Sequence, residues 1–384
     1  MKTIISAFAC LENRGSEHEL GWKCLCEHAS FGDEVHLITN AYVNANIVES
    51  IRDHSFDNVV LHFVDFPHNL YAIMTGIPGA GYQVAAYFWE FRMFFYLLRT
   101  FPRKHYDLGI KSTYGSYRWP SFLWYFAKEF HIDPVSGGGR FPLRFQSILS
   151  FKSRCRELWR ALYQRISLCD PFVLLTMWKA NVIHVGNAAT RDVLPRFVRK
   201  KCQLKADFLA INPADFRIEE ARHTVSVATD CLKLFYTGKL LEWKGVMLVL
   251  RALSELPSEV NYSFTIMGLG PAREYYSTYV QKHNLNVVFV EPSTVPRSDL
   301  SFYFFSHDLF VFPTLHGEAG FAPVEAKLHG MRLLTLDSSG LDSVLQSEDI
   351  CIDTCKKQTE AVVASISQEI KNLYGQLKGR VIPT

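Results

Sequence analysis

Residues 232–245 of the chain read LKLFYTGKLLEWKG. The apolar run that opens this stretch predicts a buried strand, and Gly238 ends the strand in a turn that carries Lys239 and Lys244. A helix is predicted to follow from about Val246 to Leu256. Ligands of parallel sheets bind at the carboxyl ends of the strands, so two lysines flanked by glycines can converge there on a diphosphate, although either lysine alone would be an ordinary surface residue.

Strands and helices continue to alternate on both sides of this stretch. Downstream, strands are predicted at 262–267, 286–290, 309–313 and 332–336, with helices at 272–283 and 323–329. Near the N-terminus, a strand is predicted from Thr3 to Ala9, a helix at 22–30 and a strand at 34–39. Such alternation is typical of doubly wound parallel sheets. We therefore predict an α/β chain with two Rossmann-like domains, at residues 1–208 and 209–384, which the length of 384 residues also favours.

The composition excludes several classes of protein. With 48% apolar and 21% charged residues, the chain is not a disordered or low-complexity protein. Nine cysteines, none in a C-x-x-C pair, favour a reduced, cytoplasmic chain without a structural metal. The apolar run after Lys2 is interpreted as the first strand of a domain and not as a signal peptide, because charged residues follow at once. We expect no membrane span.

The charge is distributed unevenly along the chain. Residues 140–205 hold 14 Lys and Arg against 3 Asp and Glu, which gives this segment a net charge of +11. Such a patch is typical of contact with anionic lipid, phosphate or nucleic acid, and a solvated helical face is the alternative. The aromatic-rich segment 82–96 could lie in the core or at a membrane, and we expect most of its aromatic residues in the core. Peripheral binding to an anionic membrane is therefore a hypothesis.

Two further motifs follow predicted strands. The sequence MGLGP at 267–271 is a glycine-rich turn that opens a helix, a pattern that also occurs as ordinary turn chemistry. The sequence PTLHGEAGFAPVEAKLHG at 313–330 is a loop with Glu318 and Gly320 that leads into a helix with Glu325 in its first turn. That carboxylate could accept hydrogen bonds from sugar hydroxyls, or could simply complement the helix dipole.

Taken together, these motifs resemble a known family. The series G-K-L-x3-K-G, G-x-G-P and E-A-G-F-A-P-V-E-A-x3-G resembles the donor domain of the GT-B retaining glycosyltransferases of family 4. In the first half, RGSE at 14–17, GSYRWPSFLW at 115–124 and PVSGGG at 134–139 look like acceptor-domain signatures of a bacterial subgroup. The resemblance covers about residues 1–345. It implies two Rossmann-like domains that face a cleft, with the last helix, near 358–377, packing back on the first domain.

The resemblance also implies a donor site. Lys239 and Lys244 would bind the nucleotide diphosphate, with Lys239 where the family usually has Arg, and Glu325 would hold the ribose hydroxyls. The family's first glutamate is out of register, because Gly317 stands eight residues before Glu325 and Glu318 comes one place later. Either Glu318 serves in its place, which we favour, or the sugar contact is lost. The remaining expected donor-binding residues are Gly238, Gly268, Gly270, Gly320, Phe321 and Ala322.

On the acceptor side, the chain lacks the histidine that relatives often carry before the G-S-Y-R segment. Lys111 or Thr113 could occupy that space. The expected acceptor-side cleft residues are Gly15, Ser16, Glu17, Lys111, Thr113, Arg118, Gly137 and Gly138.

The function that the resemblance implies is retaining transfer of a sugar from a nucleotide-diphosphate sugar to a glycan or lipid-linked acceptor, in cell-surface polysaccharide or lipopolysaccharide biosynthesis. No D-x-D follows a predicted strand, so we expect no metal and no cofactor besides the donor substrate. The enzyme would be cytoplasmic, peripherally on the inner face of the membrane. Three alternatives stay open: a catalytically silent GT-B scaffold, suggested by the displaced glutamate and missing histidine, a nucleotide-sugar epimerase, and a nucleic-acid-binding protein. The last is disfavoured because the basic run at 196–205 contains a single aromatic residue, Phe197, and no series of aromatic residues interleaved with its Arg and Lys.

Overall fold

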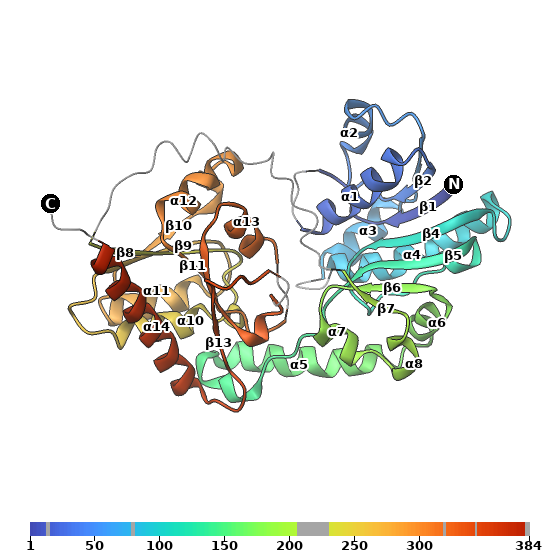
Figure 1. Cartoon of the computed structure of the whole chain (residues 1–384). Helices are drawn as coiled ribbons and strands as arrows, with labels where there is room; N and C mark the ends of the chain where they lie inside the picture. The colour runs from blue at the N-terminus through green and yellow to red at the C-terminus, as the bar shows by residue number, and fades with distance from the viewer. Residues whose placement is uncertain (13–15, 78–80, 206–229, 318–319, 342–343, 381–384) are drawn as a thin grey trace. The chain divides into compact units, whose positions relative to one another are not determined.

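The computed structural model describes residues 1–12, 16–77, 81–205, 230–317, 320–341 and 344–380 (Figure 1). The chain divides into two compact units. Unit 1 consists of Met1–Gly139 and Ala161–Ala210, and unit 2 of Arg140–Arg160 and Ile211–Thr384. The chain therefore enters unit 2, returns to unit 1 and enters unit 2 again.

Unit 1 is built on a seven-stranded parallel sheet with the strand order β3-β2-β1-β4-β5-β6-β7. The predicted N-terminal strand lies at its centre, since β1 pairs with both β2 and β4. Residues Ile4 and Ile5 are fully buried, as expected for a central strand covered on both faces. The strands are β1 (Lys2–Ala7), β2 (Glu34–Thr39), β3 (Val59–Phe63), β4 (Tyr106–Thr113), β5 (Ala127–Val135), β6 (Val182–Val185) and β7 (Cys202–Leu204).

The helices of unit 1 pack their apolar residues on this sheet. Helix α4 buries Ala85, Trp89, Met93 and Leu97, which recur every four residues and so share one helix face. Only part of its aromatic content enters the core: Trp89 is buried, whereas Tyr82, Phe88 and Phe95 are exposed. The helices are α1 (Ser16–Ser30), α2 (Ile47–Asp53), α3 (His68–Thr75), α4 (Gly81–Thr100), α6 (Pro171–Lys179), α7 (Ala188–Val193) and α8 (Arg196–Arg199), with the 3-10 turn η1 (Leu123–Tyr125).

Unit 2 is built on a six-stranded parallel sheet with the order β10-β9-β8-β11-β12-β13. Its strands lie within a residue of the predicted positions, and β13 is an addition. They are β8 (Leu232–Thr237), β9 (Tyr262–Met267), β10 (Val287–Val290), β11 (Leu309–Phe312), β12 (Arg332–Leu336) and β13 (Ile350–Ile352). The helices are α10 (Val246–Ser254), α11 (Arg273–Lys282), α12 (Leu300–Ser306), α13 (Ala322–Leu328) and α14 (Thr359–Arg380).

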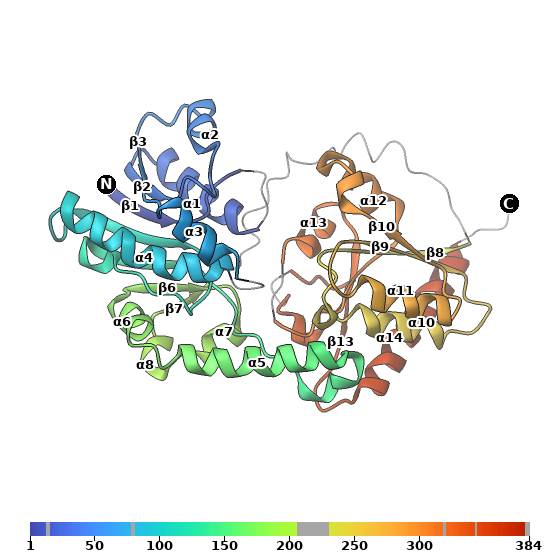
Figure 2. The ribbon, with the colours of Figure 1, turned by 180° about the vertical axis from the view of Figure 1, so that it is seen from behind.

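The last helix packs within unit 2. We expected it to pack back on the first domain, but α14 packs against α10, β8, β13 and the 3-10 turn η2 (Leu143–Ile148), all in unit 2 (Figure 2). Its apolar face, which includes Val362, Val363, Ile366 and Ile370, is fully buried there. This packing covers the nearly continuous apolar surface of α10.

The segment Arg140–Arg160 joins unit 2 although it precedes β6 and β7 of unit 1 in the chain. Phe145, Ile148 and Leu149 are buried in the core of unit 2. Next to them, Glu242 accepts hydrogen bonds from the hydroxyls of Ser150 (2.7 Å) and Ser153 (2.6 Å). A division of the chain at a single boundary does not describe this arrangement. Helix α5 (Phe151–Ser167) starts in this segment and continues into unit 1.

Candidate functional site

The sheet of unit 2 reverses its strand order between β8 and β11. From β8 the chain moves outward to β9 and β10, and from β11 it moves the other way to β12 and β13. The loops after β8 and β11 therefore lie side by side at the carboxyl edge of the sheet, where ligands of such sheets bind. Their backbones are bonded, since the Leu315 N–H donates to the Trp243 carbonyl at 3.1 Å. The two main sequence motifs of unit 2 thus meet at one edge.

Gly245 allows these two loops to touch. Its φ of +74° is in the left-handed region, and an added Cβ would lie 2.0 Å from the carbonyl oxygen of Pro313. No side chain fits at that distance. A glycine is therefore required here by backbone packing, independently of any ligand.

We expect Gly245→Ala to destabilise the protein by roughly 3 kcal/mol, because left-handed strain and displacement of the Pro313 backbone add together. Gly330→Ala is a matched control: its φ is +73°, but an added Cβ would meet nothing within 4 Å. That variant should lose only about 1 kcal/mol from backbone strain. Urea denaturation measures both, and equal losses in the two variants would show that the loop contact is not tight.

The glycines of the G-x-G turn pack on the same loop. A Cβ on Gly268 would lie 2.1 Å from the Gly238 carbonyl oxygen, and one on Gly270 would lie 2.3 Å from that of Leu240. The Leu240 N–H also donates to the Leu269 carbonyl at 2.8 Å. Close backbone packing is therefore a sufficient reason for these glycines, and their presence alone does not indicate a ligand.

The two lysines of the β8 loop have different surroundings. The ammonium of Lys244 lies 4.4 Å from the centre of the Trp243 ring and 5.0 Å from that of Phe312. It is half-buried, whereas Lys239 is exposed. A cation held against two aromatic rings is partly removed from water, so its attraction for an anion is stronger than that of a solvated lysine.

A buried histidine that stacks on Trp243 was not among the predicted site residues. His316 follows β11, is 0% exposed and stacks on Trp243 with ring centres 4.3 Å apart. Its Nε2 lies 2.9 Å from the Glu157 carboxylate of α5. The position of His316 directly after a strand was a usable signal. Its partner could not be predicted, because Glu157 reaches unit 2 only through the packing of residues 140–160.

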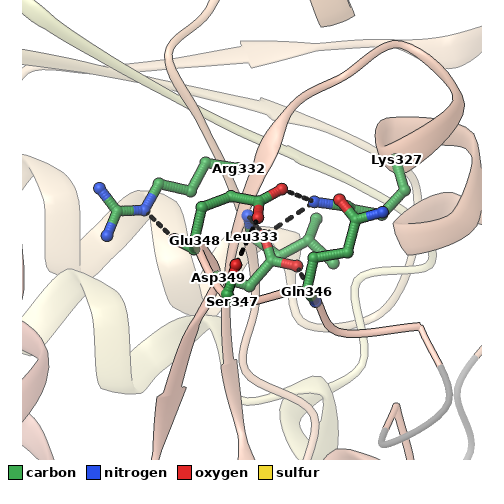
Figure 3. A network of polar contacts seen from close by, with 7 residues as sticks. All are labelled: Lys327, Arg332, Leu333, Gln346, Ser347, Glu348 and Asp349. Atoms are coloured by element: carbon green, nitrogen blue, oxygen red, sulfur yellow. Dashed lines mark hydrogen bonds and ion pairs between the residues drawn. The ribbon is translucent and has the colours of Figure 1, made fainter.

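Glu325 lies in the first turn of α13 and is 5% exposed. The other end of this short helix is anchored by Lys327, which donates to Glu348 and Asp349 at 3.0 Å each. Asp349 also accepts the N–H groups of Leu333 and Gln346 at 2.8 Å, so α13, β12 and the chain before β13 form one network (Figure 3). The helix that carries Glu325 is thereby fixed to the sheet.

The loop before α13 is described only in part. Glu318, the predicted sugar contact, lies outside the described residues. Gly320 has a φ of +73°, Phe321 caps the start of α13, and Ala322 is the first residue of the helix. The predicted donor residues Gly238, Lys239, Gly268 and Gly270 come from the neighbouring loops described above.

In unit 1, several of the predicted acceptor-side residues meet at the carboxyl ends of β1, β4 and β5. Glu17 accepts the Gly115 N–H at 3.1 Å. The guanidinium of Arg118 bonds the Ser116 hydroxyl at 2.9 Å, and Gly137, with a φ of +88°, leaves room for it, since a Cβ there would lie 3.3 Å from Arg118 Nη2. Of the remaining residues, Ser16 begins α1, Gly138 packs on the Thr190 backbone, and Gly15 lies outside the described residues.

Lys111 and Thr113 are held inside unit 1. The Thr113 hydroxyl bonds both the N–H (3.1 Å) and the carbonyl (3.2 Å) of Ala9, which ties the ends of β1 and β4 together. Lys111 is 2% exposed and interacts electrostatically with Glu90, which is equally buried. Burial raises the pKa of Glu90 to about 7, against the opposing effect of the Lys111 charge. Burial also lowers the pKa of Lys111.

This raised pKa predicts a pH-dependent stability. In the unfolded chain Glu90 ionises near pH ~4.3, but in the folded protein it holds its proton until about pH 7. The folded state therefore binds more protons over this window, and stability falls as the pH rises through it. We expect wild type to lose roughly 2 kcal/mol relative to Glu90→Gln between pH 5 and 7.5 in urea denaturation. Glu49→Gln, which changes an exposed carboxylate of α2, should show no such trend. If the difference in unfolding free energy between wild type and Glu90→Gln does not change with pH, the raised pKa of Glu90 is refuted.

Known proteins resemble this chain in sequence and in structure. Residues 218–374 match the family described as glycosyl transferases group 1, a range that includes Lys239, Lys244 and Glu325. An uncharacterized glycosyltransferase of Methanocaldococcus jannaschii is 24% identical over 182 residues. These residues are 46% of this chain and 47% of that protein, so the match spans about half the length of the relative.

Solved structures resemble the chain over almost its whole length. WaaG, a glycosyltransferase involved in lipopolysaccharide biosynthesis, has a TM-score of 0.56 at 14% identity, over 98% of this chain and 93% of that one. TarM of S. aureus has a TM-score of 0.59 at 10% identity, over 99% and 95%. The chain has the GT-B glycosyltransferase fold. HepE of Anabaena, solved with UDP, has a TM-score of 0.53 at 14% identity, over 98% and 95%.

The predicted α/β fold class is therefore confirmed as GT-B. The family match covers residues 218–374, and the solved structures, at 10–14% identity, show the fold alone. Within the described residues, no helix is both long and apolar enough to cross a bilayer.

Proposed function

We propose that this GT-B chain is a retaining glycosyltransferase that moves a sugar from a nucleotide-diphosphate sugar to a glycan or lipid-linked acceptor in cell-surface polysaccharide biosynthesis. One observation carries the proposal. The loop with Lys244 and the loop that leads to Glu325 meet at the strand-order reversal of unit 2, within the segment that matches glycosyl transferases group 1. A cation and a buried carboxylate at that edge suit a diphosphate and a ribose respectively.

Lys244 and Lys239 would stabilise the leaving diphosphate. As the bond between the anomeric carbon and the diphosphate oxygen breaks, negative charge grows on the diphosphate, and a preorganised cation lowers the energy of that transition state. The acceptor oxygen bonds to the anomeric carbon from the same face, and its proton passes to the leaving diphosphate. The lysines supply the required positive charge, so we propose that no metal ion takes part.

The carboxylates would hold the neutral parts of the donor. Glu325 accepts hydrogen bonds from the ribose hydroxyls, and we propose that Glu318 contacts the donor sugar. On the acceptor side, Glu17, Arg118 and Gly137 are the candidates, because they meet at the carboxyl edge of the sheet of unit 1. HepE and TarM have been solved with UDP, which makes UDP-sugars the first donors to test.

A donor screen tests the proposal. Calorimetry with UDP-, GDP-, ADP- and TDP-sugars, in the presence of EDTA, should reveal one preferred nucleotide, and that donor should be turned over slowly even without an acceptor. Glu318→Gln should still bind the free nucleotide but transfer sugar far more slowly. Tight binding without turnover, with or without a panel of acceptors, would exclude the enzymatic proposal. An unchanged rate in Glu318→Gln would exclude the sugar contact assigned to that residue.

A further inference from the structure

Helix α5 turns polar residues toward the protein and apolar residues toward solvent, which is the reverse of an ordinary amphipathic surface helix. The residues on its inner side are polar and bonded within their own units. Gln164 is 1% exposed and donates to the carbonyls of Gly137 (2.8 Å) and Gly139 (3.2 Å). Ser153 donates to Glu242, and Glu157, the only acidic residue of the helix, pairs with His316. The hydrogen bonds thus hold the polar side of the helix inward.

The outer side of α5 is apolar. Its large apolar residues stand in the spacing i, i+7, i+8, i+11 and i+15, which at 100° per residue places them in a stripe about 100° wide. The exposed fractions are 81% for Phe151, 59% for Leu158, 65% for Trp159, 47% for Leu162 and 54% for Ile166. We call these five residues the α5 stripe. A 17-residue helix makes the stripe roughly 25 Å long.

Cations flank the stripe on both sides. By the same helical geometry, Lys152 and Arg156 lie along one border and Arg154 and Arg165 along the other. All four are exposed. Because Glu157 is turned inward against His316, no acidic side chain of the helix interrupts this positive charge. Figure 2 shows α5 as a single unbroken helix.

We infer that α5 binds in the plane of an anionic lipid membrane, with the α5 stripe in the headgroup and acyl boundary and the four cations against lipid phosphates. An apolar stripe of this size in water is unfavourable, and two rows of cations beside it select an anionic occupant. A lipid surface meets both conditions at once. This binding does not depend on the proposed transfer activity. It gives four of the 14 cations of residues 140–205 a specific surface, and it places the membrane contact on α5 and not on the aromatic segment of α4.

The test is co-sedimentation of the full chain with vesicles of phosphatidylcholine containing 30% phosphatidylglycerol. Trp159→Ser combined with Leu162→Ser should weaken binding at least tenfold, because two large side chains no longer enter the boundary. Arg154→Gln combined with Arg156→Gln should weaken it about 25-fold, at about fivefold for each cation removed. Binding should also weaken when the salt concentration rises or when the vesicles contain phosphatidylcholine alone.

A matched pair on another helix serves as the control. Phe88 and Phe95 of α4 are 51% and 57% exposed, and Phe88→Ser with Phe95→Ser should bind vesicles within twofold of wild type. Trp159 and Leu162 are 65% and 47% exposed, so the thermal unfolding of the variant with both replaced should match that of wild type. Brominated lipid should quench tryptophan fluorescence in wild type and much less in Trp159→Phe, which should still bind.

Loss of binding in the α4 pair alone would overturn the proposal. The proposal would also be overturned if the wild-type chain formed a dimer with or without vesicles and the α5 stripe variant did not. The occupant of the stripe would then be a second copy of the chain.

Discussion

Replacing Lys244 with alanine should lower kcat by about 10²–10³-fold and leave the Kd of the donor nearly unchanged. The reason is the place of the ammonium, half-buried over the Trp243 and Phe312 rings at the end of β8. In the proposed mechanism, a cation in that position interacts more strongly with the leaving diphosphate, as its charge grows, than with the intact donor. Its loss therefore appears in the chemical step more than in ground-state binding. Steady-state kinetics with the preferred donor, combined with calorimetry, separates the two quantities.

Lys282→Ala is the matched control for this substitution. Lys282 is an exposed lysine in the last turn of α11, away from the loops after β8 and β11, so its removal should leave kcat within about twofold of wild type. If Lys244→Ala raises the donor Kd by the same factor as it lowers kcat/KM, the lysine acts in uniform binding and its transition-state role is refuted.

Replacing Glu325 with glutamine should have the opposite kinetic signature. Ribose hydroxyls do not change charge during transfer, so the contact is equally strong in the ground state and the transition state. Hydrogen bonds to a charged group contribute roughly 1.5–3 kcal/mol, and we therefore expect KM to rise about 10–100-fold while kcat changes less than about threefold. Glutamine keeps the shape of the side chain, which is needed because Glu325 is only 5% exposed.

Glu274→Gln distinguishes this role from that of a helix-dipole carboxylate. Glu274 also lies in the first turn of a helix, α11, but is exposed. Its replacement should change stability by about 0.5 kcal/mol and leave the kinetics alone. If Glu325→Gln behaves in the same way, with a small change in stability and an unchanged KM, then Glu325 only complements the helix dipole.

The strands of unit 2 could be predicted closely because their signals are local. Apolar runs that end in glycine, such as residues 232–238, specify both the strand and the edge at which a ligand would bind. The strand order then brings Lys244 and Glu325 to the same edge, as the motifs implied. The glycines of 267–271 are weaker evidence for a ligand than their G-x-G pattern suggested, because close packing of neighbouring loops already requires glycine at both positions.

The remaining features depend on contacts between distant parts of the chain. The segment 140–160 is basic in sequence, yet Phe145 and Ile148 are fully buried in unit 2, and only this packing brings Glu157 to His316. In the same way, Lys111 was expected at an acceptor site but is buried in unit 1 together with Glu90. The apolar residues of α5 stand at helical spacing in the sequence. That spacing does not tell which side of the helix faces outward, because this depends on the hydrogen bonds that hold the polar side inward.

The most direct test of the proposed activity is proton NMR of a reaction that contains the chain and its preferred nucleotide-sugar. The account predicts release of the nucleoside diphosphate together with a sugar product whose first-formed anomer matches that of the donor, and a rate at least 100-fold lower in Lys244→Ala. A product of inverted configuration would contradict the retaining mechanism. If no nucleotide-sugar is consumed with any donor or acceptor of the panel, the proposed transfer activity is wrong.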